Sequence, residues 1–240
     1  MSTPLYKRVL LKLSGEALMG QQSFGVEHHA CKKIALQIQE VYSLGLEIGI
    51  VVGGGNIFRG SQAAEFNFSR TPADHIGMLA TTINGLILQQ SLAAIGIESR
   101  VMSALGDAVV EKYVWNHAME YLRKGIVVIF VGGTGNPYFT TDSAAALRAS
   151  EVQAEALFKA TKVDGVYDDD PKKNPSAKKY ETLSYTEALM KRLNVMDAAA
   201  IALCRENQIP IYVFNLFEEG SLKKALCEQK GGTLVTGDKE

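Results

Sequence analysis

Short apolar runs rich in β-branched residues recur along the chain, and longer segments with a different apolar spacing separate them. Runs of five or six such residues are typical of strands that are buried on both faces of a sheet. The pattern predicts strands at residues 8–13, 48–52, 100–104, 126–131, 156–161, 209–214 and 233–235.

The segments between these runs place apolar residues on one helical face. Ala145, Ala149 and Val152 stand at i, i+4 and i+7, which is the spacing of an amphipathic helix. The pattern predicts a helix that contains Ile34 to Val41 and ends at Gly45, and further helices at residues 76–96, 113–124, 143–153, 185–192, 198–206 and 221–227. Because strands and helices alternate throughout, we expect an α/β fold with a mainly parallel sheet.

One segment, from Ile76 to Ile97, has no charged residue and is long enough to span a bilayer. Polar side chains interrupt it, among them Thr81, Asn84 and Gln89. We therefore expect a long helix that is buried against the sheet or against another subunit, and no association with a membrane.

Composition narrows the class of protein without identifying a function. The 240 residues, 47% of them hydrophobic, suit one large domain or two closely packed lobes. A net charge of −1 provides no basic field for nucleic acid or an anionic membrane. The three cysteines form no Cys-x-x-Cys pair, and the polar N-terminus has no signal-peptide pattern. We expect reduced thiols and a cytoplasmic location.

Three of the predicted strands end in glycine-bearing turns, at Ser14-Gly15, Gly53 to Gly55 and Gly132 to Gly135. Glycine lets the backbone approach an anion closely and present its N–H groups. If these strands are neighbours, the turns converge on one crevice at the carboxyl edge of the sheet, where α/β proteins bind ligands. A Walker A loop is absent, because the chain contains no Gly-Lys pair.

The longest of these turns runs from Val131 to Ser143 and is rich in hydrogen-bonding groups. Purely structural loops between a strand and a helix are usually shorter, so this length favours a ligand-binding loop. Asp142 stands at the start of the following helix, where its carboxylate is expected to cap free N–H groups. Asp197 stands at a second helix start.

Two cations accompany the turns. Lys12 lies near the end of an apolar strand, which favours an ammonium group beside phosphate oxygens; the alternative is an edge lysine that reaches solvent. Arg59 follows the three glycines and is a candidate for a bidentate phosphate contact, or else a surface arginine after a tight turn.

Amide-rich turns, two cations and two carboxylates describe a site for two phosphorylated ligands, where catalysis is the positioning and charge neutralisation of an in-line transfer. The sequence shows no elbow motif with a Ser-His-Asp set and no metal-ligand cluster. No general base is evident either. An acceptor phosphate with a second pKa of about 6 is already anionic at pH 7 and needs none.

These motifs resemble those of the bacterial uridylate kinases, the UMP kinase branch of the amino acid kinase family. The resemblance runs from Tyr6 to Leu234, almost the whole chain, and several long motifs occur in the family's order. They are Lys12 to Leu18, Gly53 to Asn56 with Arg59-Gly60, Asp74-His75 with Gly77 to Thr81, Gly133 to Pro137 with Phe139 to Asp142, Lys159 to Tyr167 with Asp170-Pro171, and Val195 to Asp197.

The resemblance implies a three-layer αβα sandwich, one amino acid kinase-like domain over residues 1–240 with an acceptor-binding lobe (about 1–150) and an ATP-binding lobe (about 151–240). It implies reversible transfer of the ATP γ-phosphoryl group to UMP in pyrimidine nucleotide biosynthesis, giving UDP and ADP, with Mg²⁺ held mainly by the nucleotide phosphates. The catalytic residues would be Lys12, Arg59, Asp142 and Asp197. The two aspartates would act through lysine side chains.

The same resemblance assigns ligand contacts. ATP would be held by Lys12, Leu13, Ser14, Gly15, Gly55, Arg59, Thr161, Tyr167 and Asp170. UMP would be held by Gly54, Asp74, Thr134, Gly135, Asn136, Pro137, Tyr138, Phe139, Thr140 and Thr141. Family members are typically homohexamers, activated by GTP and inhibited by UTP. The allosteric residues would be Gly20, Gln21, Gln22, Ser23, Phe24, Gly25 and Arg100.

Two other functions stay open on the residues: a kinase of the same fold that acts on a carboxylate or carbamate acceptor, and a non-catalytic nucleotide sensor. Asp74 together with Thr134 to Pro137 disfavours the first. The presence of both cations and both catalytic carboxylates disfavours the second, because a decayed enzyme is expected to have lost at least one of them.

Overall fold

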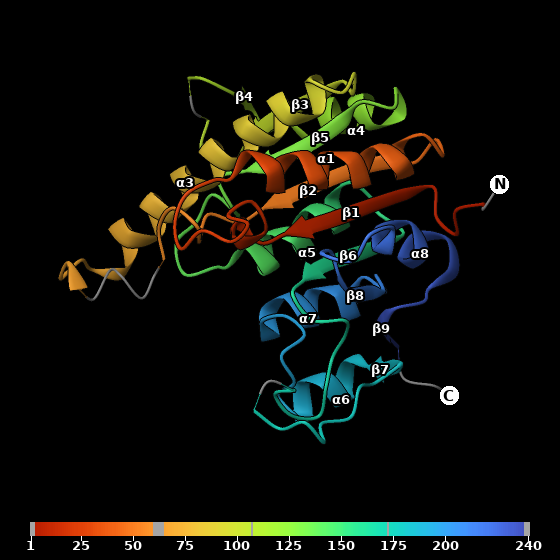
Figure 1. The fold of residues 1–240 in the computed structure, drawn as a ribbon. Helices are drawn as coiled ribbons and strands as arrows, with labels where there is room; N and C mark the ends of the chain where they lie inside the picture. Colours follow the sequence, from red (N-terminus) through yellow and green to blue (C-terminus); the bar gives the residue numbers. More distant parts are fainter. Residues whose placement is uncertain (1–2, 60–64, 107, 172, 238–240) are drawn as a thin grey trace.

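The computed structural model describes residues 3–59, 65–106, 108–171 and 173–237, and the strands within them form one nine-stranded sheet (Figure 1). The strands are β1 (Arg8–Leu13), β2 (Glu47–Val52), β3 (Ser99–Ser103), β4 (Glu111–Lys112), β5 (Val127–Val131), β6 (Ala156–Thr161), β7 (Thr182–Ser184), β8 (Ile211–Asn215) and β9 (Gly232–Thr236). Their order across the sheet is β4-β3-β5-β2-β1-β6-β8-β9-β7. All neighbouring pairs are parallel except β8 with β9, so the prediction of a mainly parallel sheet is confirmed.

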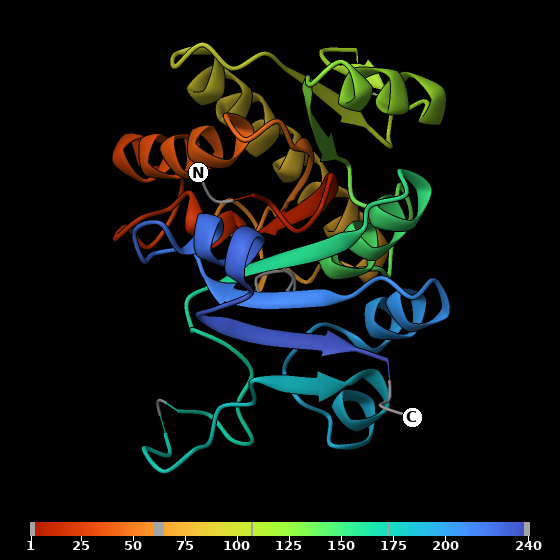
Figure 2. The ribbon, with the colours of Figure 1, turned by 90° about the vertical axis from the view of Figure 1, so that its right-hand side faces the viewer.

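Helices cover both faces of this sheet (Figures 1 and 2). They are α1 (His28–Tyr42), α3 (Arg70–Ala93), α4 (Trp115–Arg123), α5 (Thr141–Glu151), α6 (Tyr185–Met190), α7 (Ala198–Glu206) and α8 (Ser221–Glu228), with a short 3₁₀ helix η1 (Gly15–Ala17). One core joins the sheet to α1, α3 and α8, and a second joins it to α4, α5, α6 and α7. The three-layer αβα sandwich is therefore confirmed.

Because helices lie on both faces, the central strands have no solvent-facing side. Every residue of β2 and β5 is buried, and β1 has one partly exposed residue at its start. This explains why these strands appear in the sequence as continuous apolar runs without alternation.

Each of the seven predicted strands is present, with ends that differ by at most two residues. The pattern missed β4 and β7, which have two and three residues at the two edges of the sheet. Strands this short are too brief to show a period.

The uncharged segment forms α3, whose polar side chains are used inside the protein. The Asn84 amide donates to the Gly53 carbonyl at 2.7 Å, and the Gly132 amide donates to the Thr81 hydroxyl, also at 2.7 Å. The helix thereby holds the glycine turns that follow β2 and β5. Among the described residues, α3 included, no helix has the length and apolar character that a bilayer crossing requires.

Candidate functional site

The three glycine-bearing turns lie side by side at one edge of the sheet. They follow β1, β2 and β5, and these strands are consecutive in the order β5-β2-β1. The predicted convergence is confirmed. The direction in which successive strands are added to the sheet also reverses at β1, since β2 pairs with β1 on one side and β6 pairs with it on the other. Crevices at such a reversal are the usual ligand sites of α/β sheets.

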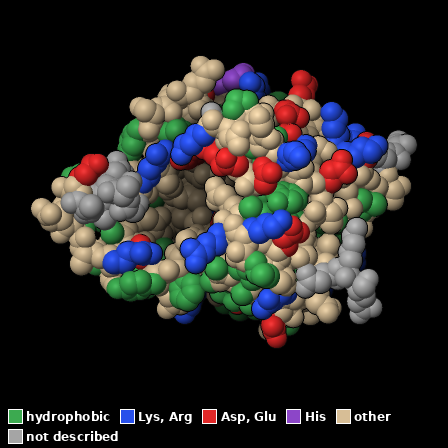
Figure 3. All heavy atoms as spheres, turned by 90° about the horizontal axis from the view of Figure 1, so that it is seen from below, with side chains coloured by type: hydrophobic (Ala, Val, Ile, Leu, Met, Phe, Trp, Pro, Cys, Tyr) green, Lys and Arg blue, Asp and Glu red, His purple; other side chains and the backbone are tan. Residues whose placement is uncertain are grey.

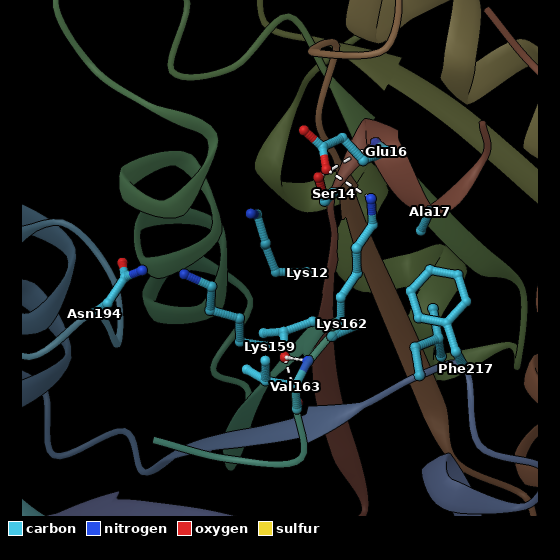
Figure 4. Close-up of a pocket in the computed structure, with 12 residues that line it drawn as sticks. Lys12, Ser14, Glu16, Ala17, Lys159, Lys162, Val163, Asn194 and Phe217 are labelled. Carbon is cyan, nitrogen blue, oxygen red and sulfur yellow. Dashed lines mark hydrogen bonds and ion pairs between the residues drawn. The ribbon is translucent and has the colours of Figure 1, made fainter. Parts of the chain in front are cut away.

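The first cavity at this edge, called the lysine pocket here, has a volume of about 340 Å³. Lysine side chains from β1 and β6 enter it on one side, and the Phe217 ring borders it on the other (Figure 4). Its lining residues are Lys12, Ser14, Glu16, Ala17, Lys159, Ala160, Thr161, Lys162, Val163, Asn194, Leu216 and Phe217.

Asp142 holds two of these lysines together. Its Oδ1 lies 2.7 Å from the Lys12 ammonium, and its Oδ2 lies 2.8 Å from that of Lys159. The two lysines are partners in the parallel β1–β6 register, so both side chains leave the sheet on the same face. All three side chains are at most 14% exposed. The cluster therefore places two ammonium groups around one carboxylate in a mostly buried site.

The charges of this cluster shift its pKa values. Burial alone would raise the pKa of Asp142, but Lys12 and Lys159 outweigh it and hold that pKa below its ordinary value. Burial lowers the pKa of Lys159, and Asp142 only partly opposes this. Asp142 is thus a carboxylate over the whole neutral range.

The prediction that Asp142 caps its helix is wrong. The cap of α5 is Thr140, whose hydroxyl accepts from the amides of Asp142 at 3.0 Å and Ser143 at 3.4 Å. The Asp142 carboxylate turns instead toward the two lysines, because a charge this deeply placed needs charged partners. Its position in the first turn still suits the helix dipole.

Asp197 does cap its helix, as its place in the sequence suggested. Its carboxylate accepts from the Ala200 amide at 2.8 Å at the start of α7. It also accepts from the hydroxyls of Thr140 and, at 2.9 Å, Ser143. Asp197 therefore joins α7 to the start of α5, next to the Asp142 cluster.

A second cavity, the threonine pocket, has a volume of about 180 Å³ and lies against the start of α3. Seven of the ten residues predicted for the acceptor line it: Gly54, Asp74, Thr134, Asn136, Phe139, Thr140 and Thr141. Gly135, Pro137 and Tyr138 belong to the same loop but are not among its lining residues, and Gly55, predicted for ATP, lines this pocket. Thr140 and Thr141 line this pocket and directly precede Asp142, whose carboxylate binds two lysines of the lysine pocket.

Asp74 organises the outer rim of the threonine pocket. Its carboxylate pairs with Arg70 at 2.9 Å and accepts from the Tyr138 amide at 2.7 Å. Tyr138 has a φ of 74°, a left-handed conformation that is costly for an aromatic residue. The contact with Asp74 helps to hold the loop in that conformation.

The remaining residues predicted for ATP are spread over the same edge. Leu13 and Gly15 are buried at the end of β1 and the start of η1. Arg59 donates to the Gly55 carbonyl at 3.0 Å and to Glu16, which lines the lysine pocket, at 2.8 Å. The roles of these residues stay predictions.

A third cavity of about 500 Å³, the acidic-loop pocket, adjoins the lysine pocket, with which it shares Val163 and Asn194. Tyr167 and Asp170 line it, as does the acidic stretch between them. The Tyr167 hydroxyl donates to Asp164 at 2.6 Å, and this hydrogen bond raises the pKa of Tyr167 to about 12. Tyr167 is therefore a neutral phenol in this pocket.

The segment predicted as allosteric lies beside a fourth cavity of about 230 Å³ next to α1, which shares Ala17, Leu216 and Phe217 with the lysine pocket. Gly20 and Gln21 line this cavity, while Phe24 is 61% exposed. Arg100 lies on β3, pairs with Glu98 at 2.8 Å and lies over the Tyr121 ring. Gln22, Ser23 and Gly25 complete the segment. Its allosteric role stays a prediction.

Sequence reasoning missed four polar residues that line the lysine pocket: Glu16, Lys159, Lys162 and Asn194. Lys159 carried the same signal as Lys12, a lysine near the end of an apolar strand. Its partnership with Asp142 was not evident, because the register that aligns the two lysines is a tertiary property.

Seen from below, the molecule is hollowed, and lysine and arginine side chains lie around the hollow (Figure 3). Within the described part of the chain, no three acidic, histidine or cysteine side chains gather into a group that could bind a metal ion. The cationic lining therefore suits phosphate groups rather than a metal bound by protein ligands alone.

Comparisons with known proteins agree with this geometry. The model of the amino acid kinase family matches residues 7–215. A uridylate kinase from Protochlamydia amoebophila (strain UWE25) is 56% identical over 232 residues, which cover 95% of this chain and 92% of that protein. The crystal structure of UMP kinase from Bacillus anthracis superposes with a TM-score of 0.93 at 42% identity, covering 98% of this chain and 97% of that one. UMP kinase from Ureaplasma parvum gives 0.91 at 40% identity, covering 96% and 99%.

Proposed function

This chain belongs to the amino acid kinase family, in its uridylate kinase branch, and we propose that it transfers the γ-phosphoryl group of ATP to UMP. It is a phosphotransferase, as its relatives are. The observation that carries the proposed reaction is the cluster of Lys12, Asp142 and Lys159, in which the residue after the threonine-pocket loop binds two lysines of the lysine pocket. It places two ammonium groups in the lysine pocket and ties them to the loop of the threonine pocket, and each pocket would receive one phosphorylated ligand.

In this proposal the triphosphate of ATP enters the lysine pocket and the phosphate of UMP enters the threonine pocket. An oxygen of the UMP phosphate attacks the γ-phosphorus, and the bond from that phosphorus to the β–γ bridging oxygen breaks. UDP and ADP result. Lys12 and Lys159 neutralise the charge that spreads over the transferring group, and Asp142 keeps both ammonium groups in place.

The acceptor needs no general base. With a second pKa of about 6, the phosphate of UMP is a dianion over most of the neutral range. The hydroxyls of Thr140 and Thr141 and the amide-rich turn after β5 are suited to hold that dianion. Thr140 also contacts Asp197, so that the acceptor loop is fixed to α7.

The proposed nucleoside contacts lie at the two ends of the site. Tyr167 and Asp170 in the acidic-loop pocket, together with Thr161 in the lysine pocket, suit the nucleoside end of ATP. Asp74 on the rim of the threonine pocket suits the ribose hydroxyls of UMP, because a carboxylate accepts two such hydrogen bonds.

We propose Mg²⁺ as the metal, bound mainly by the nucleotide phosphates. Both oxygens of Asp142 face lysines, which fits a carboxylate that organises cations more than one that binds a metal. When bound, Mg²⁺ supplies further neutralisation of the phosphate charge. The protein's part is to hold the phosphates that carry it.

Assembly and regulation follow the family in this proposal: a cytoplasmic homohexamer that GTP activates and UTP inhibits. The exposed apolar side chains of Ile76, Leu79 and Ile83 on α3 support a subunit contact there. The three free cysteines support a reducing compartment. The Gly20-to-Gly25 loop and Arg100 are the proposed effector residues.

The decisive experiment is a coupled assay of ADP release with ATP and Mg²⁺ across UMP, dUMP, CMP and acetylglutamate, with and without GTP. The proposal expects turnover with UMP that exceeds turnover with every other acceptor. Turnover with acetylglutamate would support a carboxylate kinase, and nucleotide binding without any ADP release would support a sensor.

A further inference from the structure

One acidic residue in the lysine pocket has no place in the transfer as described so far. Glu16 lies in η1, directly after β1, and lines the pocket among cations (Figure 4). Its Oε1 lies 2.8 Å from the Arg59 guanidinium, and its Oε2 lies 3.0 Å from the Lys162 ammonium. One carboxylate thus joins two cations that lie 103 positions apart in the sequence.

These two cations come from opposite sides of β1. Arg59 follows β2 and also donates to the Gly55 carbonyl at 3.0 Å. Lys162 follows β6. Since β2 and β6 flank β1 in the sheet, the bridge through Glu16 crosses the carboxyl end of the central strand. It connects the predicted acceptor lobe to the predicted ATP lobe at the edge of the lysine pocket.

The bridge is too exposed to serve mainly as a source of stability. The side chains of Arg59 and Lys162 are 47% and 44% exposed, and Glu16 is 35% exposed. Ion pairs at such exposure contribute little to the free energy of unfolding. The bridge has a greater effect on the orientation of the two cationic side chains. Arginine and lysine are long and flexible and lose rotamer freedom when they bind a ligand.

We propose that Glu16 is a positioning residue, whose carboxylate holds Arg59 and Lys162 at the edge of the lysine pocket before the donor nucleotide arrives. Both cations are then already aligned when the polyphosphate enters, so less side-chain freedom is lost on binding. This inference rests on the proposed phosphoryl transfer and adds a residue to its donor side. It opposes the simpler expectation that a carboxylate among phosphate-binding cations weakens phosphate binding by repulsion.

The test is Glu16→Gln, which keeps the shape of the side chain and removes its charge. The proposal expects KM for ATP to rise about tenfold, as expected for two side chains that lose their preorganisation, with kcat and KM for UMP changed much less. Calorimetric titration of ADP should show the same loss without turnover. Glu120→Gln is the matched control, because it removes another Lys–Glu pair, with Lys124 at 2.5 Å, outside the described pockets.

Double-mutant cycles separate positioning from a merely structural role. In a Lys162→Met background and in an Arg59→Met background, Glu16→Gln should raise KM for ATP by less than it does alone, because one of its partners is gone. If Glu16→Gln does not fold, Glu16→Asp, whose shorter side chain cannot reach both cations, provides the same comparison.

An unchanged or lowered KM for ATP in Glu16→Gln, or strictly additive effects in both cycles, would overturn the inference. A wild-type protein without UMP-dependent ADP release would instead refute the proposed function, so the two failures are distinguishable.

Discussion

Lys12 and Lys159 face each other because β1 and β6 pair in a register that makes them exact partners. Asp142, from the start of α5, then lies between their ammonium groups. Lys12 on β1 therefore has its charged neighbours on two other elements, β6 and α5.

Lys12→Ala should lower kcat by roughly 100-fold or more, because it removes one of the cations that neutralise the transition state. UMP binding should persist, since Lys12 is not among the residues that line the threonine pocket. Steady-state kinetics and a separate UMP titration check this. Lys124→Ala, which changes an exposed lysine directly after α4, is the control. If Lys12→Ala turned over as fast as the wild type, the proposed contact between Lys12 and the transferring phosphoryl group would be contradicted.

The pH profile should report Lys159. Its folded-state pKa is lowered by burial, so the ammonium group loses its proton at a lower pH than an ordinary lysine, for which the pKa is about 10.4. Activity should therefore fall on the alkaline side before that pH. In Lys159→Arg the side chain stays charged, and the fall should move to higher pH. Identical alkaline limbs in the two proteins would show that another group titrates.

At the scale of elements, α3 and the glycine turns depend on each other. Gly85 allows the helix to lie against β5, since a Cβ there would be 2.4 Å from a Val131 methyl group. Asn84 and Thr81 bind the turns from the helix side. The uncharged segment of this helix thus supports the edge of the sheet where the glycine turns lie. The local pattern showed a helix here, and its partners came from packing.

Gly54→Ala tests this support. A Cβ at Gly54 would be 2.7 Å from the Gly77 carbonyl oxygen and 2.9 Å from the Ala80 Cβ, both on α3. The turn and the helix must move apart, at a cost of about 1–3 kcal/mol in the free energy of unfolding. We expect a lower midpoint in urea and a higher KM for UMP. Gly55→Ala, where a Cβ meets nothing within 4 Å, is the control for stability.

At the scale of the whole molecule, the three cavities at this edge of the sheet divide into two groups. The lysine pocket and the acidic-loop pocket involve β1, β6 and the loops after them, while the threonine pocket involves the loops after β2 and β5 with α3. The division into an acceptor lobe and an ATP lobe stays a prediction. If the division holds, a substitution can weaken the binding of one ligand and leave the binding of the other unchanged.

Asp74→Asn should separate the two ligands. Loss of the charge weakens the proposed hydrogen bonds to the UMP ribose by about 1.5–3 kcal/mol, so the Kd for UMP should rise by one to two orders of magnitude. The Kd for ATP should change little, because Asp74 lies in the threonine pocket. Separate calorimetric titrations measure both. Equal losses for both ligands would contradict the division.

The sequence by itself determined the seven longer strands, the helices between them, the glycine turns and the mainly parallel α/β class. These features are local, since strand runs and helical faces are set by residues within a few positions of one another. It also singled out Lys12, Asp142 and Asp197, which stand at the ends of such elements.

Only the tertiary structure decided which turns are neighbours, that Lys159 aligns with Lys12, that Thr140 and not Asp142 caps α5, and that Glu16 joins Arg59 to Lys162. Each of these depends on strand order or register, which join residues far apart in the chain. No periodicity within one element carries that information, because strand pairing is settled by the burial of all the elements together.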